Sequence, residues 1–227
     1  MFSSVAPCYD KANGYLSLGL YKWWNKQLVL TASKSDPQLL LDLCAGTGDI
    51  AITFLKHLNN SKAILLDFCQ DMLDLAKIKA SKNDLDHQIN DFICADAQSI
   101  PLQNDLVDAI TIAYGIRNVR DPLKCVQEAF RVLKPGGRLA ILELTRPSNP
   151  FMRFGHRVYL KGVVPVLGKW VASDKNAYAY LSKSIGAFIA PSVITQFMKQ
   201  SGFTKTKIIP LMGGVASIIV GDKEPTA

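Results

Sequence analysis

The sequence has few residues of the kinds that build metal centres or disulfide frameworks. Among its 227 residues are five cysteines and three histidines. The cysteines are scattered without the paired spacing of metal ligands, and three lie at or near the ends of apolar runs. We therefore interpret all five as reduced structural thiols and expect no metal site. They are Cys8, Cys44, Cys69, Cys94 and Cys125.

Long apolar runs are also missing. No stretch approaches the roughly 20 apolar residues that a membrane-spanning helix needs, so any membrane contact should be peripheral. The first residues include Asp10 and Lys11 and no continuous apolar stretch, which is unlike a secretory signal. We expect a cytoplasmic protein that associates with the inner face of the membrane at its surface.

The composition fits one globular domain covering residues 1–227. The chain is 48% hydrophobic and 20% charged, which allows a substantial core. Its net charge of +7 permits contact with nucleic-acid phosphates or with an anionic membrane, and charge alone does not choose between them. No repeat or low-complexity tract is present.

From residue 39 onward, short apolar runs alternate with segments of helical periodicity. This alternation predicts βαβ units and a parallel sheet. The predicted helix at 122–133 is followed by Lys134-Pro135-Gly136-Gly137, a strong helix stop. We expect strands at 39–44, 63–67, 89–94, 107–114 and 139–144, and helices at 49–58, 71–80 and 122–133.

The second half of the chain departs from this rhythm. Residues 146–190 are too long for an ordinary connection and predict an inserted helical cap. A helix at 191–200 and two apolar runs at 206–212 and 215–220 follow, which predicts a C-terminal antiparallel hairpin. Residues 1–35 are interpreted as an N-terminal helical arm. The predicted fold is an α/β doubly wound sheet, mostly parallel, with these additions.

A glycine-rich turn at 42–49 joins the first strand to the first helix. Gly46 and Gly48 would let a cofactor approach the backbone amides, and Thr47 lies between them. The competing interpretation is a dinucleotide-binding turn, but an acid at Asp49 would repel a pyrophosphate there. S-adenosylmethionine instead carries an ammonium and a sulfonium, which Asp42 and Asp49 could attract.

Acidic residues also end the next two predicted strands. Asp67 is positioned to accept hydrogen bonds from both hydroxyls of an adenosine ribose, and Phe68 could pack on the adenine. At the third strand, Asp96 and the backbone amide of Ala97 could bind the adenine edge, although a helix N-cap is an alternative role for Asp96. Ligands of open α/β sheets bind at the carboxyl ends of strands, where all these residues fall.

Taken in order, these motifs resemble those of class I methyltransferases. More specific segments make the chain similar to the ubiquinone and menaquinone biosynthesis C-methyltransferase family over nearly its whole length. These segments are 2–10, 114–119 (Tyr-Gly-Ile-Arg-Asn-Val), 178–185 and 213–216. The family often has Ser-Phe-Gly where this chain has Ala113-Tyr114-Gly115, so we leave Ala113 out of the predicted site.

The resemblance implies S-adenosylmethionine as cofactor, with contacts at Thr47, Asp67 and the Asp96-Ala97 pair. It implies ring C-methylation of a polyprenylated quinol, with demethylmenaquinol ahead of a benzoquinol of ubiquinone biosynthesis. Alternatives are an RNA or small-molecule methyltransferase and a non-catalytic lipid-binding module. We expect no nucleic-acid partner, since no nucleobase-directed signature is recognised, and a homodimer stays open.

Arg117 and Asn118 are the candidate catalytic residues. Because a guanidinium stays protonated in proteins, Arg117 would stabilise the forming quinol oxyanion while a water accepts the proton. The alternative is a structural arginine that ties the strand end to the loop at Asp121. His57 and His87 are interpreted as surface residues, and His156 in the cap is a weaker candidate base.

The cap interleaves cations with large apolar groups over residues 151–171. This mixture suits a wall for a prenyl tail or a surface that meets lipid headgroups. A helical cap that packs on the sheet with solvated basic residues is the alternative. The arm residues from Tyr15 to Trp24 could close over the cofactor or join the same surface.

Overall fold

A computed structural model provides the coordinates. It describes residues 14, 17, 19–147, 149–159, 162 and 189–225. The first part of the predicted arm, and residues 160–161 and 163–188 of the predicted cap, lie outside these ranges.

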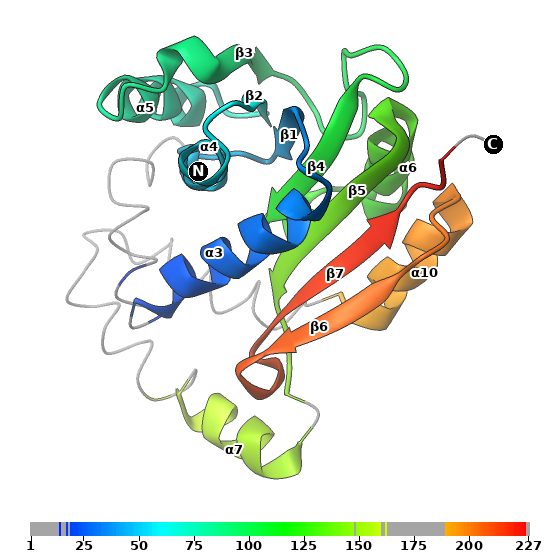
Figure 1. The fold of residues 1–227 in the computed structure, drawn as a ribbon. Helices are drawn as coiled ribbons and strands as arrows, with labels where there is room; N and C mark the ends of the chain where they lie inside the picture. The colour runs from blue at the N-terminus through cyan, green and yellow to red at the C-terminus, as the bar shows by residue number, and fades with distance from the viewer. Residues whose placement is uncertain are drawn as a thin grey trace.

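A seven-stranded sheet forms the centre of the described part, in the order β3-β2-β1-β4-β5-β7-β6 (Figure 1). Strands β1 to β5 pair in parallel, and β7 runs antiparallel to both β5 and β6. The predicted fold class and the C-terminal hairpin are confirmed. The strands are β1 (Leu39–Leu43), β2 (Lys62–Asp67), β3 (Ile89–Cys94), β4 (Val107–Ala113), β5 (Leu133–Leu144), β6 (Lys207–Leu211) and β7 (Ala216–Asp222).

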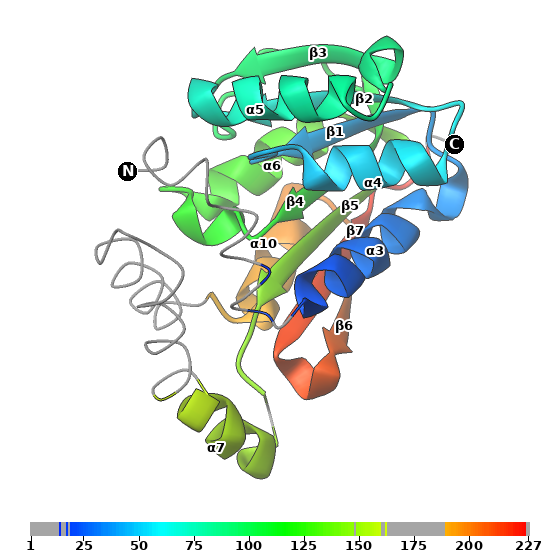
Figure 2. The ribbon, with the colours of Figure 1, turned by 90° about the vertical axis from the view of Figure 1, so that its left-hand side faces the viewer.

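Helices cover both faces of this sheet (Figure 2). Side chains alternate across a strand, so Leu40 packs in the core under α3 and α4, whereas Leu41 packs in the core under α6 and α10. Burial on both faces explains why β1 is a continuous apolar run apart from Asp42. The helices are α3 (Leu20–Ala32), α4 (Asp49–His57), α5 (Gln70–Ser81), α6 (Pro122–Val132) and α10 (Pro191–Ser201).

Strand β5 begins earlier than predicted. The helix stop after α6 is confirmed, but β5 begins at Leu133 instead of residue 139. Leu133 pairs with Val107 and Arg138 pairs with Ala109, so the register shifts across the Lys-Pro-Gly-Gly segment. This pairing depends on β4, which is distant in sequence, and local periodicity therefore could not indicate it.

Part of the inserted segment forms α7 (Pro150–Val158), which lies apart from the sheet beyond the end of β5 (Figures 1 and 2). The Asn149 side chain caps its N-terminus by accepting hydrogen bonds from the amides of Phe151 and Met152. None of its residues is buried. Within the described ranges, every helix is too short or too polar to cross a bilayer.

Candidate active site

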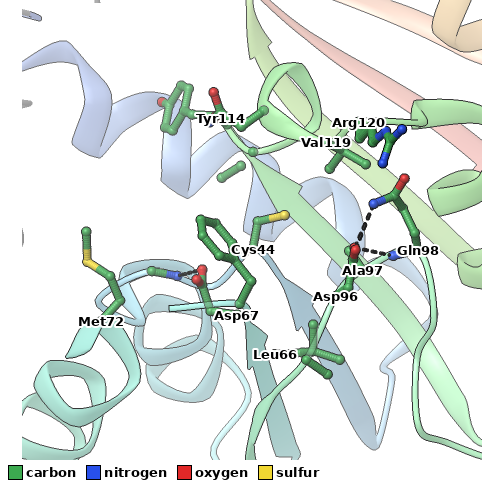
Figure 3. Close-up of a pocket in the computed structure, with 16 residues that line it drawn as sticks. Cys44, Leu66, Asp67, Met72, Asp96, Ala97, Gln98, Tyr114, Val119 and Arg120 are labelled. Carbon is green, nitrogen blue, oxygen red and sulfur yellow. Dashed lines mark hydrogen bonds between the residues drawn. The ribbon is translucent and has the colours of Figure 1, made fainter. Parts of the chain in front are cut away.

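The carboxyl ends of the first four strands meet at one edge of the sheet, and a cavity of about 290 Å³ opens there (Figure 3). Six of the residues that the sequence predicts for the site line this cavity. They are Gly46, Asp67, Phe68, Asp96, Ala97 and Asn118.

Asp67 joins the glycine-rich turn to the end of β2. Its carboxylate accepts hydrogen bonds from the amide of Gly46 at 2.8 Å and from the amide of Cys69 at 2.9 Å. Burial raises the pKa of Asp67, and these hydrogen bonds oppose that effect. The Phe68 amide also hydrogen-bonds this carboxylate. A carboxylate has about four lone-pair sites, so Asp67 can still accept a hydrogen bond from a ligand.

The opposite end of the cavity is formed by the residues after β3. The Asp96 carboxylate accepts hydrogen bonds from the backbone and side-chain nitrogens of Gln98 at 2.8 to 2.9 Å, which lowers the pKa of Asp96 (Figure 3). Ala97 beside it is buried. Phe68 is 59% exposed and supplies an apolar surface to the same cavity.

Thr47 lines a smaller neighbouring cavity, which shares Gly46 and Tyr114 with the larger one. Lys79 on α5 donates hydrogen bonds to the Thr47 hydroxyl at 2.9 Å and to Asp49 at 2.6 Å. The charge of Asp49 is therefore balanced within the protein. The sequence analysis had expected that charge to attract the ligand, and it did not anticipate Lys79.

Gly48, just before α4, and Asp42, on β1, line neither cavity. A Cβ on Gly48 would lie 3.1 Å from both Ala76 and Leu65, and its φ of 79° also favours glycine. Asp42 is 1% exposed and accepts a hydrogen bond from the Thr111 hydroxyl at 2.8 Å. Burial raises the pKa of Asp42 to about 7. Both residues therefore hold the shape of the turn through their packing and hydrogen bonding.

The structure separates the two predicted catalytic residues. Asn118 lines the larger cavity, whereas the Arg117 guanidinium contacts the buried carboxylate of Glu143 on β5. The structural alternative for Arg117 named the loop at Asp121, and the observed partner is Glu143 instead. Arg117 Nε is buried and has no hydrogen-bond partner among the described residues.

Several cavity residues were not predicted. Tyr114 lines both cavities, and its hydroxyl donates a hydrogen bond to Asn25 of α3 at 3.2 Å. Tyr21 and Asn25 line the smaller cavity together with Gly46 and Thr47, so α3 lies beside the glycine-rich turn. Tyr114 and Cys44 both have a φ of 56°, a conformation that the sequence indicates only at glycine. Ala113, which the sequence analysis left out, also lines both cavities.

The cavity fits the adenosine half of S-adenosylmethionine. It offers a carboxylate at the end of β2, a carboxylate followed by a buried alanine after β3, and the exposed aromatic side chain of Phe68. No phosphate-sized cluster of basic side chains lines it in the described part, where Arg120 is the one cation. Together with the sheet order, this arrangement defines a class I S-adenosylmethionine-dependent methyltransferase.

Comparison with known proteins supplies the family. The sequence model of the ubiE/COQ5 methyltransferase family matches residues 1–223, and the chain belongs to this family. Demethylmenaquinone methyltransferase of Protochlamydia amoebophila is 46% identical, with 98% of this chain and 93% of the relative covered. The protein of the same name from Thermus thermophilus is 38% identical, with 98% and 100% covered.

Two further comparisons extend this result. A mitochondrial 2-methoxy-6-polyprenyl-1,4-benzoquinol methylase of Caenorhabditis elegans is 37% identical, with 98% of this chain and 78% of the relative covered. A putative S-adenosylmethionine-dependent methyltransferase structure from Methanococcus maripaludis superposes with a TM-score of 0.67 at 17% identity, covering 100% and 96% of the two chains. At this identity, the superposition shows a shared fold alone. The chain is thus a methyltransferase that uses S-adenosylmethionine.

Proposed function

We propose that the chain methylates a ring carbon of a polyprenylated quinol and that its substrate is demethylmenaquinol, which becomes menaquinol. The observation that carries this proposal is the pattern of identities among full-length relatives. Identity is 46% to a relative named for demethylmenaquinone and 37% to one named for a benzoquinol. Ring methylation in ubiquinone biosynthesis is the second candidate, which the benzoquinol methylase supports.

We assign the cofactor to the larger cavity. Asp67 binds the ribose hydroxyls, Phe68 packs on the adenine, and Asp96 with the Ala97 amide binds the adenine edge. Gly46 brings the backbone close to the ligand, and Thr47 lies at its methionine end in the smaller cavity. Asp42 and Gly48 act by holding the turn in shape. When bound, S-adenosylmethionine supplies the methyl group for transfer from sulfur to carbon.

The protein must also make the ring carbon nucleophilic. Loss of a proton from the neighbouring quinol hydroxyl does this, and donors aimed at the resulting oxyanion stabilise it. Asn118 lines the cavity and can donate its amide to that oxygen. Arg117 can support the same charge, because its buried Nε lacks a partner among the described residues and an unmade buried hydrogen bond is costly. A water accepts the hydroxyl proton. After the methyl group has moved from sulfur to the ring carbon, that carbon loses its hydrogen as a proton to water and the oxygen regains one, which restores the aromatic quinol.

The substrate also determines where the enzyme works. Each methylene withdrawn from water contributes about 0.8 kcal/mol, so a long isoprenoid tail stays in the bilayer. We propose a cytoplasmic enzyme that associates peripherally with the inner face of the membrane. Apolar side chains exposed on α7, with Arg153 and Arg157 on the same helix, support this proposal. A homodimer stays a prediction from the sequence.

A turnover assay tests the proposal. Purified protein is incubated with methyl-labelled S-adenosylmethionine and either a demethylnaphthoquinol or the corresponding benzoquinol under reducing conditions. Label should enter the organic phase with the naphthoquinol, and the Asp67→Ala variant should lose this transfer. Label found only with the benzoquinol would move the assignment to ubiquinone biosynthesis. Cofactor binding without transfer to either quinol would refute the proposed function.

A further inference from the structure

A third cavity, of about 330 Å³, lies between the start of α3 and α7. We call it the α3–α7 groove. Its walls are mainly apolar, with Leu20 and Trp24 from α3 and Phe151, Met152 and Tyr159 from the α7 segment. His156 also lines it, and burial lowers the pKa of this imidazole, which favours its neutral form. The size is at the lower end of the range of about 300 to 1,000 Å³ for small-molecule sites.

One helix carries residues of both this groove and the cofactor region. Leu20 and Trp24 line the α3–α7 groove, whereas Tyr21 and Asn25, the next residue in each case, line the smaller cavity beside the glycine-rich turn. Asn25 also accepts the hydrogen bond from Tyr114, which lines the larger cavity. A molecule with a ring near Tyr114 could therefore extend an attached chain across α3 into the groove.

The groove is continuous with an exposed apolar surface. Phe151 lines the groove and is 84% exposed, and Phe154 and Val158 on the same helix are 68% and 53% exposed. Residues three and four apart share a helix face, so these three side chains form one stripe. Arg153 and Arg157 lie on the same helix, and residues 149–159 contain no acid. The positive charge of this helix complements anionic lipid headgroups. The apolar stripe would enter the bilayer surface, which would place the groove beside the lipid hydrocarbon.

We propose that the α3–α7 groove binds the isoprenoid tail of the quinol substrate as the tail leaves the bilayer. This inference rests on the proposed function and adds a tail site to it. The groove supplies the apolar contacts that replace lipid around the first isoprene units, while the ring reaches the cofactor cavity. Burial of the apolar surface of the tail in the groove would then favour tailed quinols over tail-free ones, without polar contacts to the tail.

Gly155 allows a direct test, because it lines the groove and a Cβ there meets nothing within 4 Å. The Cβ of Gly155→Leu would meet open space, and the rest of the side chain would occupy part of the groove. Gly162 is the matched control: a Cβ there also meets nothing within 4 Å, the residue is exposed, and it does not line the groove. The two Gly→Leu substitutions match in the side chain that is added.

The experiment compares kcat/KM for a naphthoquinol without a tail and one with three isoprene units, in the same detergent. The ratio of the tailed to the tail-free value should fall about tenfold or more in Gly155→Leu and stay at the wild-type value in Gly162→Leu. Farnesol, an isoprenoid without a ring, should compete with the tailed substrate in the wild type and much less in Gly155→Leu.

Two results would overturn the groove assignment while leaving the proposed function in place. One is an unchanged ratio in a folded Gly155→Leu variant. The other is a lack of farnesol competition in the wild type, which decides the matter even if the variant does not fold. Failure of the wild type to methylate either quinol would instead refute the proposed function itself.

Discussion

The guanidinium of Arg117, in the turn after β4, contacts the carboxylate of Glu143 on β5, and both side chains are buried. Arg117 is 9% exposed and Glu143 is fully buried. Burial raises the pKa of Glu143, while the neighbouring guanidinium opposes this effect. The turn after β4 also contains Asn118. The ion pair therefore holds this turn, and Asn118 with it, against the adjacent strand β5.

Removing one partner should destabilise the protein. Arg117→Ala leaves a buried carboxylate without its counter-charge, which typically costs about 3 to 5 kcal/mol. The double variant Arg117→Met with Glu143→Leu should recover much of this loss, because neither charge remains buried. Urea unfolding measures both variants. A free energy of unfolding for Arg117→Ala within about 1 kcal/mol of the wild-type value would contradict a structural role for the pair.

Gly115 is required by its close approach to Cys44. A Cβ at position 115 would lie 2.4 Å from the Cys44 Cβ and 2.8 Å from its sulfur. Gly115→Ala should therefore push the turn after β4 away from the end of β1 and weaken S-adenosylmethionine binding about tenfold or more. Calorimetric titration measures this loss. Gly155→Ala, where a Cβ meets nothing within 4 Å, should bind the cofactor as the wild type does.

Asp42 should give the stability a specific pH dependence. Burial raises its pKa from 3.8 to about 7, so between these values the folded chain holds a proton that the unfolded chain has released. Its contribution to stability therefore falls as the pH rises through this window. Between pH 5 and 8 this effect should lower the free energy of unfolding of the wild type by about 2 to 3 kcal/mol. Asp42→Asn cannot ionise and should not show this decrease.

Urea unfolding at pH 5, 6, 7 and 8 measures this effect as the difference between the wild type and Asp42→Asn. The gap in unfolding free energy should move in favour of the variant by about 1.4 kcal/mol per pH unit up to about pH 7 and level off above it. Parallel pH profiles for the two proteins would show that Asp42 is ionised in the folded state throughout this range.

The exposed stripe on α7 should control membrane binding. Phe154 is 68% exposed and does not line the groove, so Phe154→Ser removes an apolar contact with lipid without altering the tail site. Burying a phenylalanine contributes about 1.5 to 3 kcal/mol, so binding to anionic vesicles should weaken by roughly tenfold or more. Vesicle co-sedimentation measures this.

Ile78→Ser on α5 provides the control, because Ile78 is also exposed, at 52%, but belongs to a different helix. It should leave vesicle binding unchanged. Equal losses in Ile78→Ser and Phe154→Ser, or no loss in Phe154→Ser, would argue against α7 as the lipid-contacting element.

Much of the sheet could be predicted because its strands are apolar runs bounded by turns. Strands β1 to β4 lie within a residue of their expected positions, and β3 matches completely. The start of β5 was wrong, since pairing between Leu133 and Val107 is a non-local contact across a shifted register. Local pattern identifies an element, but a distant partner decides where a strand begins.

The candidate site shows the same division. Asp67 and Asp96 reach one cavity because parallel strands end at a common edge, a rule that needs only the strand assignments. Lys79 beside Asp49, and Glu143 beside Arg117, depend on side chains that meet only in the folded chain. The position of Tyr114 follows from a positive φ at a residue that rarely adopts one.

We expect the cavity at the ends of β1, β2 and β3 to bind the methyl donor, and a crystal structure of the protein with S-adenosylhomocysteine would show whether it does. The ribose hydroxyls should lie within hydrogen-bond distance of the Asp67 carboxylate, and the adenine should pack against Phe68 with its edge toward Asp96 and Ala97. A ligand bound elsewhere, or held in this cavity beyond the reach of Asp67, would contradict this assignment.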